Sequence, residues 1–230
     1  MNNDELQSLP INDAVSKELI NTSLDLTVDY GEMALDSFLN HDPISEIPIV
    51  KSIVALGKFG ISIKELHFTK KVLCFLKEFH SRSSTDNIVE FKNKLNTDQR
   101  FKDKVTEQII LIIDRLRTEQ RAVLLAKLLM GHIQEKYNWE TFCYFSECLD
   151  SMQFIDIAVL DYLFVNKHAG IGNIDVTTDD KYMILASVER LKSYGFVGVQ
   201  DLTFIGSSDE FKKEAYLSSL GKVIHNSINA

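Results

Sequence analysis

Apolar residues are densest between Thr97 and Asp150, where their spacing predicts two consecutive long helices. In the first, which ends at Arg117, they recur every three or four residues and share one face (Phe101, Val105, Ile109, Ile112, Ile113 and Leu116). The second, Thr118–Ile133, has little polar surface and therefore needs neighbours on most of its sides. We expect the rest of the chain to pack around this pair.

Segments on both sides of the pair also have helical spacing. It predicts further helices over Asp13–Asn21, Lys64–His80, Asp86–Leu95, Trp139–Leu149 and Phe154–Val165, the last with Ile155, Ala158, Val159 and Tyr162 inward. Thr97 and Asn138 are suited to cap the helices that follow them. Ser23–Tyr30 alternates as a strand does, whereas Asp29–Leu39 returns to helical spacing and is predicted to be mostly helix.

The spacing of apolar residues predicts one helix over Ile47–Ile63, which is apolar except for a narrow polar stripe containing Lys51 and Lys58. Pro48 suits a first helical turn. With two lysines, the run is too short and too charged for a membrane span, which needs about 20 mostly apolar residues. A helix in the core is favoured. The alternative is a helix at a membrane surface, with its lysines at lipid headgroups.

The pattern changes after Asn166 to a small mixed α/β end. A helix over Asp179–Ser193 is predicted, with Gly195 as a left-handed cap and Phe196 as its apolar contact. Two strands and a closing helix complete this end (Phe196–Val199, Ala215–Ser218 and Leu220–Ile228).

This end resembles a winged-helix domain, a three-helix unit with a β-hairpin. Ser187–Val197 and Tyr216–His225 carry the resemblance through Leu191, Gly195, Leu217, Ser218 and Gly221. No clear second helix precedes Asp179, so the helix-turn-helix half is shortened or absent. The predicted fold is mainly α: a multi-helix bundle followed by a small winged-helix-like α/β end. Its parts are an acidic helical segment (1–46), a helical core (47–150) and the α/β domain (151–230).

The order of these pieces also resembles bacterial proteins of the abortive-infection alpha type. In those proteins a helix rich in Leu and Ala, here Arg121–Met130, is followed by a helix with Phe and Leu and then by a degenerate winged helix. Ile47–Leu76 further looks like a stretch that precedes the helical core in uncharacterised bacterial proteins. The resemblance implies a role in phage defence, with Ile47–Leu76 as the effector or docking segment.

The formal charge of −8 is unevenly distributed. Residues 1–50 hold ten acids and one base, and residues 51–82 hold seven bases and two acids. Pairing of these two regions within the protein is the favoured interpretation. The alternative is a basic surface for lipid or another anionic partner, made by Lys51, Lys58, Lys64, Lys70 and Lys71.

Residues able to perform chemistry are scattered. The six histidines form no HxxxH or HExxH pair, and the three cysteines lack paired spacing, which indicates a reducing compartment. We therefore predict no catalytic residues, no metal ligands and no cofactor. Met1–Pro10 lacks the pattern of a secretory signal, so a cytoplasmic location is expected, with peripheral membrane attachment through residues 47–80 as an alternative.

The predicted function is a non-enzymatic interaction protein of the bacterial cytoplasm, with a protein partner or a second copy of itself. The alternative is a winged-helix transcription regulator that contacts DNA through Lys181, Arg190 and Lys192. Residues 151–230 hold seven bases against ten acids, which disfavours binding to nucleic acid.

Overall fold

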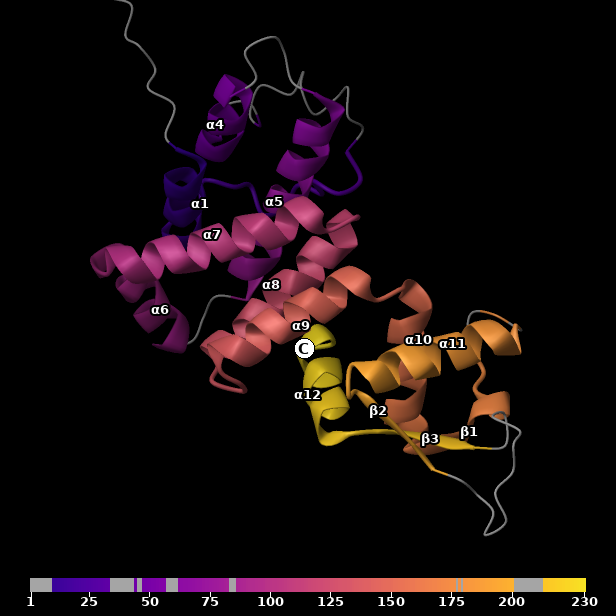
Figure 1. Ribbon diagram of the computed structural model, residues 1–230. Helices are drawn as coiled ribbons and strands as arrows, with labels where there is room; N and C mark the ends of the chain where they lie inside the picture. Colours follow the sequence, from indigo (N-terminus) through magenta and orange to yellow (C-terminus); the bar gives the residue numbers. More distant parts are fainter. Residues whose placement is uncertain are drawn as a thin grey trace, which may run out of the picture. The chain divides into compact units, whose positions relative to one another are not determined.

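The computed structural model describes residues 10–33, 44, 47–56, 62–82, 86–176, 178, 180–200 and 213–230. The protein is mostly helical and has a three-stranded antiparallel sheet near the C-terminus, as predicted (Figure 1). It divides into unit 1, Met1–Tyr137, and unit 2, Asn138–Ala230. The division therefore falls after Tyr137 and not at residue 150, and the acidic segment 1–46 belongs to the same unit as the helices that follow it.

Unit 1 is built from helices, of which α5 and α8 lie side by side. Those described are α1 (Ile11–Ile20), α4 (Pro48–Leu56), α5 (Ile63–Ser81), α6 (Asp86–Thr97), α7 (Gln99–Arg115) and α8 (Glu119–Ile133). The predicted central pair corresponds to α7 and α8, whose apolar residues are buried (Ile109, Ile112, Ile113, Leu125, Leu128 and Leu129). The expectation that this pair is covered by the rest of the chain is confirmed.

The caps of these helices follow local chemistry. The Asp98 carboxylate accepts from the backbone N–H of Phe101 at 3.0 Å and begins α7. Thr97, predicted as that cap, is instead the last residue of α6, and its hydroxyl donates to the carbonyl of Asn93. The prediction was wrong because a carboxylate, one residue further on, competes for the same N–H groups.

The helix predicted over Ile47–Ile63 is also corrected. Helix α4 ends at Leu56, and Ser62 forms a capping box with Glu65 that begins α5. Residues 57–61, including Lys58, lie outside the described part of the chain. Helix α4 packs against α1 and α5 with Ile49, Val50 and Ile53 buried, as the core interpretation of this stretch requires.

Ser23–Tyr30 is not a strand. The carboxylate of Asp25 accepts from the backbone N–H of Thr27 at 2.9 Å, and that of Asp29 accepts from Gly31 at 3.0 Å. These bonds fold the segment into turns, because short acidic side chains compete with regular backbone pairing. The predicted helix over Asp29–Leu39 is absent from residues 29–33, and residues 34–39 are not described.

Unit 2 combines helices with the small sheet. Its elements are α9 (Trp139–Ser151), α10 (Phe154–Asn166), β1 (His168–Gly170), the 3₁₀ turn η1 (Ile171–Asn173), α11 (Lys181–Ser193), β2 (Val197–Gln200), β3 (Glu214–Leu217) and α12 (Ser219–Ile228). Strand β3 is central and pairs antiparallel with both β1 and β2. Strand β1 is not among the two strands that the sequence predicts, because Gly170 and the residues after it are turn formers.

Two glycines connect the sheet of unit 2 to its helices. Gly195 has φ +70° after α11, as the predicted left-handed cap requires. At Gly221 a β-carbon would lie 1.9 Å from the carbonyl oxygen of Phe196, so only glycine allows α12 to approach this closely. Asn138 caps α9 as predicted, since its side chain accepts from the N–H of Thr141 at 2.9 Å.

Candidate functional site

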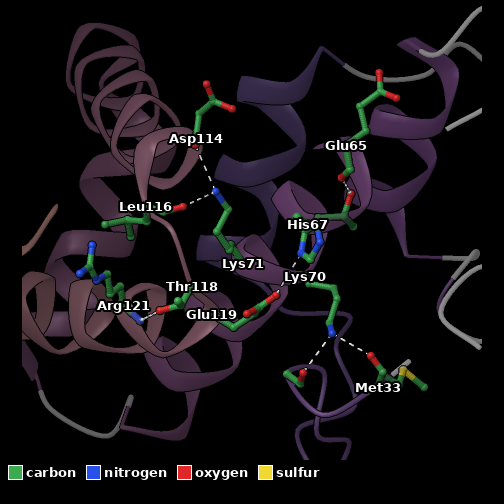
Figure 2. A network of polar contacts seen from close by, with 12 residues as sticks. Met33, Glu65, His67, Lys70, Lys71, Asp114, Leu116, Thr118, Glu119 and Arg121 are labelled. Atoms are coloured by element: carbon green, nitrogen blue, oxygen red, sulfur yellow. Dashed lines mark hydrogen bonds and ion pairs between the residues drawn. The ribbon is translucent and has the colours of Figure 1, made fainter. Parts of the chain in front are cut away.

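The two central lysines of the predicted basic surface are buried in unit 1. Lys70 is 7% exposed, and its ammonium donates to the carbonyls of Gly31 at 3.0 Å and Met33 at 2.7 Å. Lys71 is 6% exposed and points the other way, to the carbonyls of Asp114 at 3.1 Å and Leu116 at 2.7 Å (Figure 2).

These bonds give both lysines a structural role. The carbonyls at the end of α7 carry its negative dipole end, which stabilises a cation such as Lys71. Lys70 ties α5 to the acidic 21–33 segment, where Lys77 also donates to the carbonyl of Val28 at 2.8 Å. The prediction that Lys70 and Lys71 contact lipid or another anionic partner is therefore wrong, because both ammonium groups are buried against backbone carbonyls.

Of the remaining lysines of the predicted surface, the structure describes Lys51 and Lys64. Lys64 is highly exposed and lies 3.5 Å from the carboxylate of Asp114. Lys51 is half-buried and Lys58 is not among the described residues. Contacts between the acidic and basic regions are seen at Lys70 and Lys77, whose ammonium groups donate to backbone carbonyls of residues 28–33.

A second group of polar side chains lies where α5 meets the start of α8. The Nδ1 atom of His67 is 3.6 Å from a carboxylate oxygen of Glu119 (Figure 2). Burial, reinforced by the charges of Glu119 and Asp29, raises the pKa of the nearby Cys74 thiol to about 12. Such a thiol stays protonated at neutral pH and is a poor nucleophile. Within the described ranges, no three His, Cys, Asp or Glu side chains gather as metal ligands would.

In unit 2, the predicted DNA contact Arg190 is part of a buried network. Asp156 is fully buried, and its two oxygens accept from Arg190 Nη2 and Nε at 2.8 Å each. The same carboxylate accepts from the hydroxyl of Ser187 and the backbone N–H of Gln153, both at 2.7 Å. This bonding raises the pKa of Arg190 above its ordinary value.

Arg190 therefore joins α11 to α10, and its assignment as a DNA contact is corrected. The other two predicted DNA contacts lie on the surface of α11. Lys181 is exposed beside the capping Asp180, and the ammonium of Lys192 lies 3.2 Å from the carboxylate of Glu189. An acid next to each exposed lysine weakens the phosphate neutralisation that DNA binding needs.

Helix α10 has a feature that the sequence prediction did not single out. Its sequence, FIDIAVLDYLFVN, is apolar on nearly all sides. One face is buried in unit 2 (Ile155, Val159, Leu160 and Leu163). The other leaves Val165 76%, Phe154 60% and Phe164 43% exposed.

A broad groove of about 570 Å³ runs along the exposed side of α10, lined by Ala158, Asp161, Tyr162, Val165, Asn166, Asp175 and Val176. Ala158 and Tyr162, predicted to face inward, are half-buried in its wall. Asp161 accepts from the side-chain amide of Asn229 at 2.9 Å and lies 3.0 Å from Nε2 of His225. With Asp161 and the exposed Asp175, the groove combines an apolar surface with negative charge.

Comparison of the chain with known protein families, curated proteins and solved structures gives no significant match. Among the helices of the described residues, none is both long and apolar enough to cross a membrane.

Proposed function

We propose that this protein is a non-enzymatic interaction protein that binds a partner protein through the exposed face of α10. The supporting observation is a helix that is apolar on nearly all sides, with large apolar side chains exposed at both of its ends and half-buried residues between them. Such helices are normally enclosed by neighbours, and an exposed apolar patch with a polar edge is typical of a docking site.

The chemistry of the groove indicates what the partner presents. Val165 and Val176 favour apolar side chains, whereas Asp161 and Asp175 favour lysine or arginine beside them. An amphipathic helix with basic residues at its edge meets both requirements. The buried ionisable groups described above support an interaction role over catalysis, because Lys70, Lys71 and Asp156 all hold backbone or side-chain groups of their own unit.

The proposal shifts the docking role from Ile47–Leu76 to α10. In the first segment, Ile49, Val50 and Ile53 are packed inside unit 1, so they do not offer an apolar surface to a partner or to lipid in this conformation. Binding to a membrane surface through residues 47–80 is the weaker proposal for the same reason. A role in bacterial phage defence, in the cytoplasm, rests on the sequence resemblance alone.

A peptide library provides a test that does not require the partner to be known. Panning on the full chain should enrich peptides that combine apolar residues with Lys or Arg. An enriched peptide should bind at least about tenfold more weakly to Val165→Glu, because one buried valine contributes about 1.5 kcal/mol or more. Val89→Glu is the matched control, since Val89 on α6 is 59% exposed and lies in unit 1. Equal binding to both variants, or no enrichment, would refute the proposal.

A second candidate function is DNA binding, which the topology of unit 2 favours. The order of its elements, helix α10, strand β1, turn η1, helix α11, hairpin β2–β3 and helix α12, resembles that expected of a winged helix with a shortened second helix. A gel shift at low salt distinguishes the candidates. Our proposal predicts no retarded band, whereas a band weakened by Lys181→Ala plus Lys192→Ala would favour DNA binding. Arg190 is not a suitable probe, because its substitution also disturbs the Asp156 network.

A further inference from the structure

A polar pocket of about 250 Å³ lies in unit 1, between α1, α6 and α7. Its lining combines donors of three kinds, namely lysine ammonium groups, side-chain amides and a hydroxyl (Asp13, Ser16, Lys17, Ile20, Asn21, Leu95, Asn96, Gln99 and Lys102). Two lysines stand against one aspartate, so the lining carries a net positive charge.

Ser16 is the most buried polar residue that lines this pocket. The residue is only 2% exposed, yet its hydroxyl makes no hydrogen bond to any other described residue. Serines in the helices of this protein ordinarily donate to the carbonyl four residues earlier, as Ser52 does at 2.9 Å and Ser146 at 2.8 Å. The Ser16 side chain lines the pocket, so its hydroxyl is available to a molecule inside it.

The remaining donors differ in how far they are already engaged. The ammonium of Lys17 and the side-chain amides of Asn21 and Asn96 are exposed and have no hydrogen-bond or ion-pair partner among the described residues. Lys102 is paired with Asp13 at 2.9 Å. The side chain of Gln99 donates to Asp103 at 2.8 Å, which leaves its oxygen as an acceptor.

We propose that this pocket binds a small phosphorylated polyol of the size of a sugar phosphate. Lys17 and the hydroxyl of Ser16 would bind the anionic group, with Lys102 adding positive charge nearby. The amides of Asn21 and Asn96 would bind the hydroxyls, because an amide both donates and accepts. The site lies wholly in unit 1 and shares no residue with the α10 groove, so it stands independently of the proposed docking function.

Binding can be measured by calorimetric titration of the full chain with ribose 5-phosphate, glucose 6-phosphate and glycerol 3-phosphate. At least one should bind saturably and at least about tenfold more tightly than ribose, because the anion supplies the charged contacts. Chemical-shift changes in nuclear magnetic resonance spectra should fall on the amides of residues that line the pocket.

Substitutions then test the assignment of the residues. Lys17→Gln and Ser16→Ala should each weaken binding, the first by about tenfold. Lys136→Gln is the matched control, since Lys136 is exposed in unit 1 and does not line the pocket, and it should bind as the native chain does. The inference is overturned if none of the three phosphates binds saturably. It is also overturned if Lys17→Gln and Lys136→Gln bind equally well, since binding would then lie elsewhere.

Discussion

Replacing Asp156 with alanine removes the carboxylate that joins α10 to α11 in unit 2 and is expected to destabilise that unit severely. Three losses follow from the structure. The backbone N–H of Gln153 loses its acceptor, and the buried hydroxyl of Ser187 loses its partner. The guanidinium of Arg190 loses both bonds, although its side chain is 26% exposed and can turn partly to water.

The size of the effect can be estimated from these contacts. Loss of a helix cap costs about 1 kcal/mol, and a buried hydroxyl without a partner costs about 1–3 kcal/mol. The ion pair adds only about 1 kcal/mol, because water screens the part of Arg190 that is exposed. Asp156→Ala is therefore expected to lower the free energy of unfolding of unit 2 by about 3–5 kcal/mol, in the range for a broken buried pair.

Urea unfolding followed by tryptophan fluorescence measures this loss selectively. Trp139 is the single tryptophan of the chain and lies in unit 2, where its ring packs 5.0 Å from that of Phe142. With a slope of about 2 kcal/mol per molar urea, the midpoint should fall by about 2 M. The exposed Asp175 provides the control, because Asp175→Asn should change stability by less than about 0.5 kcal/mol. If both variants unfold at nearly the native midpoint, the Asp156 network does not stabilise unit 2 and our reasoning is refuted.

Three further predictions concern unit 1 and the thiols. Lys71→Ala should lower the free energy of unfolding by about 2 kcal/mol, because two backbone carbonyls lose a charged hydrogen-bond donor. Lys64→Ala, which removes only an exposed ion pair, should lower it by less than about 0.5 kcal/mol. Equal effects of the two variants in urea unfolding followed by circular dichroism would contradict this prediction. Cys143, which is half-buried, should be alkylated before Cys74, because a pKa of about 12 leaves only a fraction of roughly 10⁻⁴ of the Cys74 thiol ionised at pH 8. The order of alkylation can be read by peptide mass spectrometry, and alkylation of Cys74 first would contradict the prediction. Burial lowers the pKa of His80 below its ordinary 6.5, so its contribution to stability is intact above that pH and is lost as the pH falls toward the folded-state pKa. The free energy of unfolding, measured across this pH range, should fall less steeply with falling pH for His80→Gln than for the native chain. An equal pH dependence of the two would contradict this role of His80.

The parts of the fold that the sequence predicted are those decided by neighbours along the chain. The spacing of Ile109, Ile112 and Ile113 specifies one face of α7, and that face is buried as expected. The cap at Asn138 and the left-handed turn at Gly195 are likewise local, and both were predicted at the correct residue.

The surprises come from contacts between distant residues. Lys70 meets a carbonyl 37 residues away, Lys71 one that is 45 residues away, and Arg190 a carboxylate that is 34 residues away. A count of charges shows that the basic region has an excess of cations, but it does not show which carbonyl each cation reaches. Periodicity has a similar limit in α10, since a helix that is apolar on nearly all sides has no polar face to indicate its orientation.

The exposed apolar face of α10 is the central claim, and nuclear magnetic resonance with a peptide selected on the full chain tests it most directly. The amide signals that shift on titration should belong to Ala158, Asp161, Val165 and Val176, and Val165→Glu should abolish those shifts. Shifts confined to the helices of unit 1, or none at concentrations that saturate binding, would contradict the account.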